Sequence, residues 1–76
     1  MQIIGDNIKS ELKEANMTQR ELSEYSRIDR ATVNKYVNGE LMPTIINLNN
    51  MAVALCCRPE DLLTFDGDII EKYKKG

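Results

Sequence analysis

The chain has 76 residues, which is enough for one domain and too few for two, and its 42% apolar and 29% charged residues are typical of a globular protein. Its formal net charge is −2, so any basic surface for nucleic acid would have to be local. It contains no histidine, and its two cysteines, Cys56 and Cys57, are adjacent, so we expect reduced thiols, no metal site, no cofactor and no enzymatic activity.

Apolar residues recur at helical spacing from end to end of the chain, and no segment alternates with the period of a strand. The first apolar stripe consists of Ile4, Ile8, Leu12 and Ala15, at steps of four and three residues. This spacing predicts an amphipathic helix over about 5–15. Asn16 follows where a left-handed residue would close the helix, a conformation that asparagine tolerates better than most residues.

The segment 18–29 contains two signals for the start of a helix. Thr18 and Glu21 have the spacing of a capping box, in which each side chain accepts a hydrogen bond from the other residue's backbone amide. This pattern predicts a second helix that ends near 26–27. Asp29 is a strong N-cap for a third helix, which we expect to run from Arg30 to about Val37.

Two more helices are predicted in the second half of the chain. Thr44 is the expected N-cap of a fourth helix, whose apolar stripe is Leu48, Met51, Ala52 and Leu55. Pro59 suits the first position of a short fifth helix that ends near Leu63, and the acidic residues at 60 and 61 match the dipole at its start. After Phe65, the segment 66–68 reads as a turn.

The predicted fold is all-α, with five short helices around one core in residues 1–65. We expect a C-terminal tail over 66–76, either one more helical turn or a frayed end. The residues expected in the core are Leu12, Leu22, Ile28, Val33, Leu48, Met51, Leu55 and Leu62, and Met42 is expected to pack as well.

Residues 18–39 carry the arrangement that points to a function. Two short helices, each capped at its start and joined by a short connection near 26–29, form a helix-turn-helix, whose second helix enters the major groove of DNA. A small side chain suits Ser23, where the two helices would touch, and an apolar one suits Ile28 in the turn. The segment has a charge balance of +1, and the rest of the chain sums to −3; its charged residues are Arg20, Arg27, Arg30 and Lys35 against Glu21, Glu24 and Asp29.

A co-linear set of residues over about 4–65 resembles the phage-repressor-type (Cro/CI, or XRE) helix-turn-helix family. The set is Met17-Thr18-Gln19, Glu21-Leu22, Ile28-Asp29-Arg30, Thr32-Val33, Asn38-Gly39, Pro43-Thr44, Leu48, Met51-Ala52, Ala54-Leu55 and Pro59 to Leu63. The resemblance implies a five-helix, lambda-repressor-like DNA-binding domain. The chain departs from the family at Arg27, where glycine is usual in the turn, and a positive φ at this arginine would cost roughly 1 kcal/mol.

The resemblance also implies roles for individual residues of the motif. Base-edge contacts are implied for Arg30, Ala31 and Lys35, with Asn34 as a further candidate, and phosphate contacts for Gln19, Arg27, Thr32 and Asn38. Arginine bonds bidentately to guanine, and the alanine methyl group packs on thymine. A solvated helix face is the alternative for Arg30 and Lys35, plain exposure is the alternative for Gln19, and termination of the helix is the alternative for Asn38.

The expected function is that of a sequence-specific DNA-binding transcriptional regulator, and a repressor in particular. One reading helix covers only a few base pairs, so we expect a homodimer on half-sites about 34 Å apart. The dimer contact would be formed by the tail, where Ile69 and Tyr73 share a helical face, or by the fourth and fifth helices.

The alternative function is that of a protein-interaction module, such as an antitoxin or an anti-repressor, whose main partner is a protein. The acidic exterior favours this alternative. Nothing in the sequence reads as a signal peptide or a membrane span, so we expect a cytoplasmic location and no membrane partner.

Overall fold

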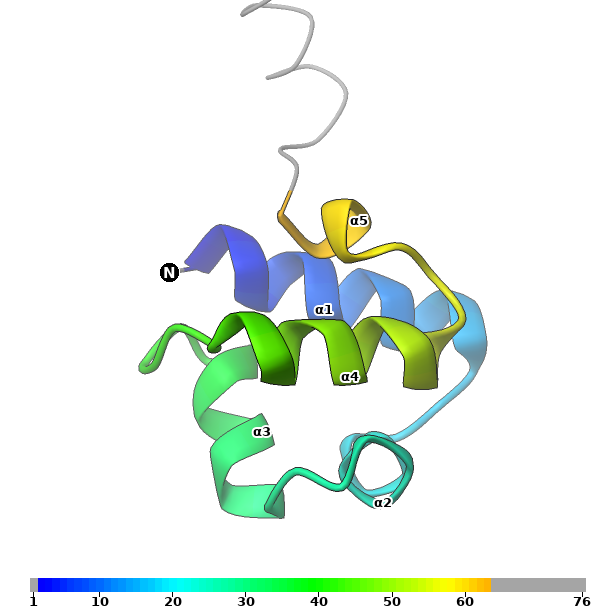
Figure 1. The fold of residues 1–76 in the computed structure, drawn as a ribbon, viewed down its shortest axis with the longest axis horizontal. Helices are drawn as coiled ribbons and strands as arrows, with labels where there is room; N and C mark the ends of the chain where they lie inside the picture. The colour runs from blue at the N-terminus through cyan, green and yellow to red at the C-terminus, as the bar shows by residue number, and fades with distance from the viewer. Residues whose placement is uncertain (1, 64–76) are drawn as a thin grey trace, which may run out of the picture.

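The computed structural model describes residues 2–63, which form five helices around one core (Figure 1). The helices are α1 (Gln2–Ala15), α2 (Gln19–Ser26), α3 (Arg30–Val37), α4 (Ile45–Leu55) and α5 (Pro59–Leu63). The predicted all-α fold is confirmed, and within these residues there is no strand. The tail predicted over 66–76 and the expected domain boundary at 65 lie outside the described residues.

The hydrogen bonds at the helix starts explain why α2, α3 and α4 begin where they do. The Thr18 hydroxyl accepts from the Glu21 amide at 3.1 Å, and the Glu21 carboxylate accepts from the Thr18 amide at 3.0 Å, so the predicted capping box is present. Asp29 accepts from the amide of Ala31 at 3.2 Å at the start of α3. Thr44 accepts from the amide of residue 47 at 3.1 Å at the start of α4.

The first helix begins at Gln2, three residues before the predicted start at Gly5. Glycine is a weak helix former, so its presence in the interior of a helix calls for a reason in the packing. The structure gives the glycine another role, because a Cβ at this position would collide with the backbone carbonyl oxygens of Tyr36 and Val37. Gly5 therefore lets the last turn of α3 lie directly on α1.

Three helices end at a residue in the left-handed conformation that is not glycine. Asn16 has φ 53°, Arg27 has φ 60° and Cys56 has φ 58°. The first two were expected from the sequence, and Cys56 was not. At Arg27 the backbone N–H donates to the Ser23 carbonyl, so the strained residue closes the last turn of α2.

The core is aliphatic and draws on all five helices. Its buried hydrophobic residues are Ile4, Ile8, Leu12, Leu22, Ile28, Val33, Tyr36, Val37, Leu48, Met51, Ala52, Leu55 and Leu62. All eight residues predicted to form the core are therefore buried. Two other predictions are wrong: Met42 is 59% exposed because it lies in the loop between α3 and α4, and Ala15 is exposed at the last turn of α1.

The helices are arranged so that α2 and α3 form one edge of the molecule. α2 packs against α3 and α4, α3 packs against α1, and α5 packs against α1 and α4. In Figure 1, α2 and α3 lie below α4, whereas α5 lies above α1 on the opposite side. None of the helices in residues 2–63 combines the length and the hydropathy that a membrane crossing requires.

Candidate nucleic-acid interface

The corner between α2 and α3 is held closed by hydrogen bonds across its turn. The Ser23 hydroxyl donates to the Ile28 carbonyl at 2.6 Å, and the Ile28 amide donates to the Ser23 carbonyl at 3.2 Å. Ile28 is buried, as the motif predicts, and Leu22 and Val33 are buried on either side of it. The crossing of the two helices is thus fixed by apolar packing below and by paired hydrogen bonds in the turn.

An open depression lies on the outer surface of this corner. It is lined by Gln19 at the start of α2 and by Arg30, Ala31 and Asn34 on α3. The three α3 residues are exposed, and Gln19 is half-buried. Three of the four residues predicted to touch bases are therefore brought together with one residue predicted to touch phosphate.

Three amide side chains on this surface form a continuous chain of hydrogen bonds. Asn38 Nδ2 donates to Asn34 Oδ1 at 3.1 Å, and Asn34 Nδ2 donates to Gln19 Oε1 at 3.4 Å. We call Gln19, Asn34 and Asn38 the amide chain. The sequence places Asn34 and Asn38 four residues apart on one helix face, and the family resemblance implies that Gln19 supports a base-reading side chain without saying which one.

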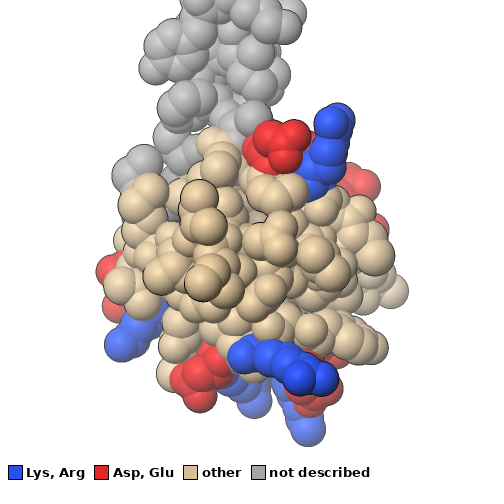
Figure 2. Space-filling view, viewed as in Figure 1, with Lys and Arg blue, Asp and Glu red and all other residues tan. Residues whose placement is uncertain are grey.

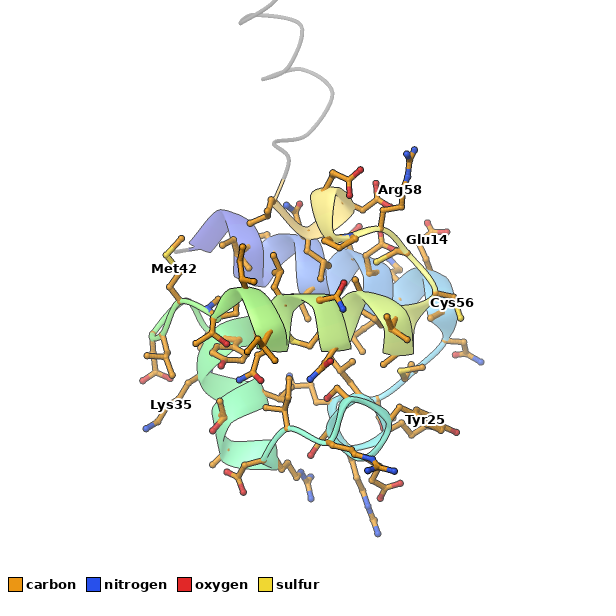
Figure 3. All side chains as sticks on the ribbon, viewed as in Figure 1. Glu14, Tyr25, Lys35, Met42, Cys56 and Arg58 are labelled. Carbon is orange, nitrogen blue, oxygen red and sulfur yellow. The ribbon has the colours of Figure 1, made fainter. Side chains whose placement is uncertain are left out.

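The remaining predicted contact residues do not line the depression. Lys35 is exposed on α3 and points outward, away from the body of the protein (Figure 3). Arg27 is exposed in the turn, and Thr32 is half-buried on α3. The structure thus separates a central group, formed by the depression and the amide chain, from three residues that do not line it.

Of the four cations near the corner, which are Arg20, Arg27, Arg30 and Lys35, only Arg20 forms an ion pair within residues 2–63. Arg20 pairs with Glu24 at 3.4 Å, although both side chains are largely exposed, so the pair stabilises the helix only weakly. Within residues 2–63, Arg30 and Lys35 have no ion-pair partner. Their charges remain available to an anion.

Acidic residues lie on both sides of the molecule, because Glu21, Glu24 and Asp29 belong to the α2–α3 corner itself. Glu60 and Asp61 belong to α5, on the side of the molecule opposite the α2–α3 corner (Figure 1). Asp61 accepts a hydrogen bond from the Arg58 amide at 3.0 Å, which gives this carboxylate a capping role. In the part of the chain that the structure describes, no cluster of three or more His, Cys, Asp or Glu side chains is arranged to hold a metal ion.

A second surface stands out because it carries no charge. α4 contains no charged residue, and Figure 2 shows an uncharged expanse over it. Ile45 is 81% exposed, Ile46 70% and Val53 68%, and Leu63 on α5 is also exposed. A groove between α4 and α5 is lined by Ile45, Ile46, Leu63 and Pro59, among others. We call this surface the α4 face.

The two thiols are free and differ in their surroundings. Cys56 is exposed, and Cys57 is half-buried against the core. Burial, together with the nearby charges of Glu11 and Asp61, raises the pKa of the Cys57 thiol to about 11. Cys57 is therefore a packing group that stays protonated at neutral pH.

Comparison with known proteins identifies related domains. The family model described as the Cro/C1-type HTH DNA-binding domain matches residues 7–68. The fold is similar to that of the restriction-modification controller protein C.AhdI from Aeromonas hydrophila, with a TM-score of 0.77 and 23% sequence identity over 80% of this chain and 92% of that chain. At this identity the likeness concerns the fold. No curated protein gives a significant match.

Proposed function

The chain belongs to the Cro/C1-type helix-turn-helix DNA-binding family, and we propose that it is a sequence-specific repressor of transcription that inserts α3 into the major groove. The observation that carries this proposal is the surface of α3. Arg30, Ala31 and Asn34 are exposed together on the outer side of the helix, and the charge of Arg30 is unpaired within residues 2–63. A regulatory role also agrees with the likeness in fold to a controller protein.

The residues of the corner divide into two roles. Arg30, Ala31, Asn34 and Lys35 would contact base edges, since side chains at the start of the second motif helix reach furthest into the groove. Gln19, Arg27, Thr32 and Asn38 would contact phosphates, which fixes the register of the protein on the duplex. The position of Gln19 in the first turn of α2 suits this role, because backbone N–H groups at a helix start also favour anions.

The protein would act as a homodimer, formed through the α4 face. Exposed Ile45, Ile46 and Val53 give this face the apolar character of an interface core, and α4 has no charge that an interface would have to desolvate. In Figure 1 the α4 face looks towards the viewer and the α2–α3 corner lies along the lower edge. Two copies joined face to face by a vertical two-fold axis would present both α3 helices at the same edge, ready for adjacent half-sites.

A regulator of this kind would act in the cytoplasm, where it binds its operator. The test of the function is selection of bound sequences from a random duplex pool, followed by mobility-shift titrations at two salt concentrations. We expect a palindromic sequence, bound less tightly at higher salt because phosphate contacts release counterions. Absence of any bound duplex at low salt would favour the alternative of a protein-interaction module, such as an antitoxin or an anti-repressor.

A further inference from the structure

The end of α3 is closed by two backbone hydrogen bonds across its last turn. The Gly39 amide donates to the Tyr36 carbonyl at 3.2 Å, and the Glu40 amide donates to the Lys35 carbonyl at 2.9 Å. Asn38 is the C-cap residue, with φ −84° and ψ −1°, and Gly39 follows it with a left-handed φ of 76°. This is a Schellman motif, and its two hydrogen bonds hold the conformation of the linkage between Asn38 and Gly39.

This turn is exposed to solvent. A Schellman motif is commonly reinforced by an apolar contact between the residues that its outer hydrogen bond joins, but here these residues are Lys35 and Glu40. Asn38 and residues 40–42 are exposed, and Gly39 is half-buried. Because exposed hydrogen bonds with few buried contacts open locally, we expect the turn to open while the core stays folded.

Asn38 and Gly39 form the only Asn-Gly pair in the sequence, and such a pair can react with itself. Hydroxide removes the proton of the Gly39 amide, and the nitrogen attacks Cγ of Asn38. The N–Cγ bond forms, the Cγ–Nδ2 bond breaks, and Nδ2 leaves as ammonia with a proton taken from water. Water then opens the resulting succinimide ring at either carbonyl, which leaves aspartate or isoaspartate. Glycine favours the attack because it has no side chain to obstruct it.

The closed turn prevents this attack. A ψ near 0° turns the Gly39 nitrogen towards the backbone nitrogen of Asn38 and away from its Cβ, and the Gly39 N–H is engaged with the Tyr36 carbonyl. The side chain of Asn38 is held as well, since its Nδ2 donates to Asn34 Oδ1 at 3.1 Å. Ring closure therefore requires rotation about ψ of Asn38, which opens the turn.

Deamidation would act directly on the α2–α3 corner. The new carboxylate has no hydrogen to donate to Asn34, and isoaspartate also lengthens the backbone between α3 and the loop that follows it. Residues 18–39 have a charge balance of +1, which one further negative charge reduces to zero. Because attraction to phosphates supplies much of the affinity for DNA, the product should bind every duplex less tightly.

We propose that Asn38 and Gly39 form a self-modification site, at which the free protein deamidates and permanently loses affinity for DNA. The loss of affinity rests on the proposed function, whereas the reaction itself does not. Bound operator protects the site, because a phosphate contact to Asn38 keeps the turn closed. The protein thus has a limited lifetime as a regulator while it is not on DNA.

The first experiment locates the reaction. The full chain is incubated at mildly alkaline pH, and peptide mass spectrometry follows the conversion of amide to acid at each asparagine. Asn16 is the matched control, because it is also exposed at a helix end but is followed by Met17. We expect Asn38 to convert at least about tenfold faster than Asn16, at a rate proportional to hydroxide concentration. Urea below the unfolding transition should change this rate little, since local opening exposes little surface.

The second experiment measures the consequence for DNA binding, with an operator selected from a random duplex pool. The deamidated protein and Asn38→Asp should both bind the operator about tenfold less tightly than fresh protein. Operator at about ten times its Kd should slow the reaction about tenfold, because only the free fraction of the protein reacts. Asn38→Gln is the control for ageing. Its attack would have to close a larger ring, so its affinity, whatever the starting value, should stay constant during incubation.

The outcomes separate this proposal from the function on which it rests. If Asn38 converts no faster than Asn16, or if urea accelerates the conversion as steeply as it promotes unfolding of the whole chain, the site is wrongly assigned. If the deamidated protein binds the operator as tightly as fresh protein, or if operator gives no protection, the function stands and this proposal is wrong. If fresh protein binds no duplex, the function fails and with it the proposed effect on DNA, and mass spectrometry decides the reaction alone.

Discussion

The hydroxyl oxygen of Ser23 lies 2.6 Å from the carbonyl oxygen of Ile28, and this hydrogen bond spans the turn of the helix-turn-helix. Between the two residues lies Arg27, which holds a left-handed φ of 60°. The bond therefore helps to hold a conformation that arginine adopts at a cost of about 1 kcal/mol. This turn affects both the stability of the protein and its proposed contact with DNA. Substitutions at Arg27 can measure the two effects separately.

Replacement of Arg27 by glycine should raise stability and weaken DNA binding. Glycine adopts the left-handed conformation without strain, so we expect the free energy of unfolding to rise by up to about 1 kcal/mol in urea titrations. If the arginine contacts a phosphate, the slope of log Kd against log salt should decrease by about 1. Arg27→Lys keeps the charge and the strain, so it should change neither quantity much; an unchanged salt slope in Arg27→Gly would rule out the phosphate contact.

Replacement of Gly5 by alanine should destabilise the protein, although alanine is the better helix former. The added methyl group would collide with backbone carbonyls of α3, which cannot move without shifting the whole helix, so we expect a loss of about 1–3 kcal/mol. Ser10→Ala, at an exposed position of the same helix, is the control and should be neutral or slightly stabilising. Equal stability of the two variants in urea would contradict the close contact.

Replacement of Arg30 by alanine should weaken specific binding by about 1–3 kcal/mol and relax the base preference at one operator position. The reason is that its guanidinium is exposed in the depression and free to bond to a base. Arg58→Ala is the matched control, because Arg58 lies beside α5, away from α3 (Figure 3). Mobility-shift titrations on the selected operator and on an unrelated duplex measure both effects, and equal losses for the two variants would argue against base reading.

A charge placed on the α4 face should prevent dimer formation without unfolding the subunit. Ile46→Lys puts an ammonium group at a position that is 70% exposed, so the cost should fall on the interface. Sedimentation should then show a monomer, whereas Tyr25→Lys on α2, 65% exposed, should leave the association state unchanged. Ile69→Asp tests the tail as the other candidate dimer contact. If this variant dissociates the dimer and Ile46→Lys does not, the assignment of the interface to α4 is wrong.

The stability of the protein should fall at alkaline pH because of Cys57. Its pKa is raised from 9.0 to about 11 in the folded state, so the unfolded chain loses the thiol proton first. The free energy of unfolding should therefore decrease as the pH rises from about 9 towards 11. Cys57→Ala should remove this part of the decrease, and iodoacetamide at pH 8 should modify exposed Cys56 well before Cys57.

The sequence predicts the helices well where the signal is local. The start of α3 follows from its N-cap, Asp29, and the start of α2 follows from the capping box, because each signal acts within one turn of backbone. Gly5 shows the opposite case, since its contact partner lies more than thirty residues away and local propensity points to the wrong start for α1. Met42 fails for a similar reason, because hydrophobicity alone does not tell a loop residue from a core residue.

The candidate site was predicted residue by residue but not as an arrangement. Motif position brings Arg30, Ala31 and Asn34 to one helix face, and the structure agrees. The link from Asn34 to Gln19 joins residues of two helices, and only their packing brings the two amides together. The exposure of Ile45 and Ile46 could not be predicted from the sequence either. Periodicity shows which residues share a helix face, but it does not show which face packs against the other helices.

The scarcity of available cations at the corner has a consequence for the protein in the cell. Attraction to phosphates supplies nearly all of a regulator's affinity for random DNA, and at this corner it depends on the three cations without an ion pair, Arg27, Arg30 and Lys35. Random chromosomal sequences should therefore retain few copies of the protein. A small number of molecules per cell would then suffice to keep an operator occupied, because fewer of them are lost to competing sites.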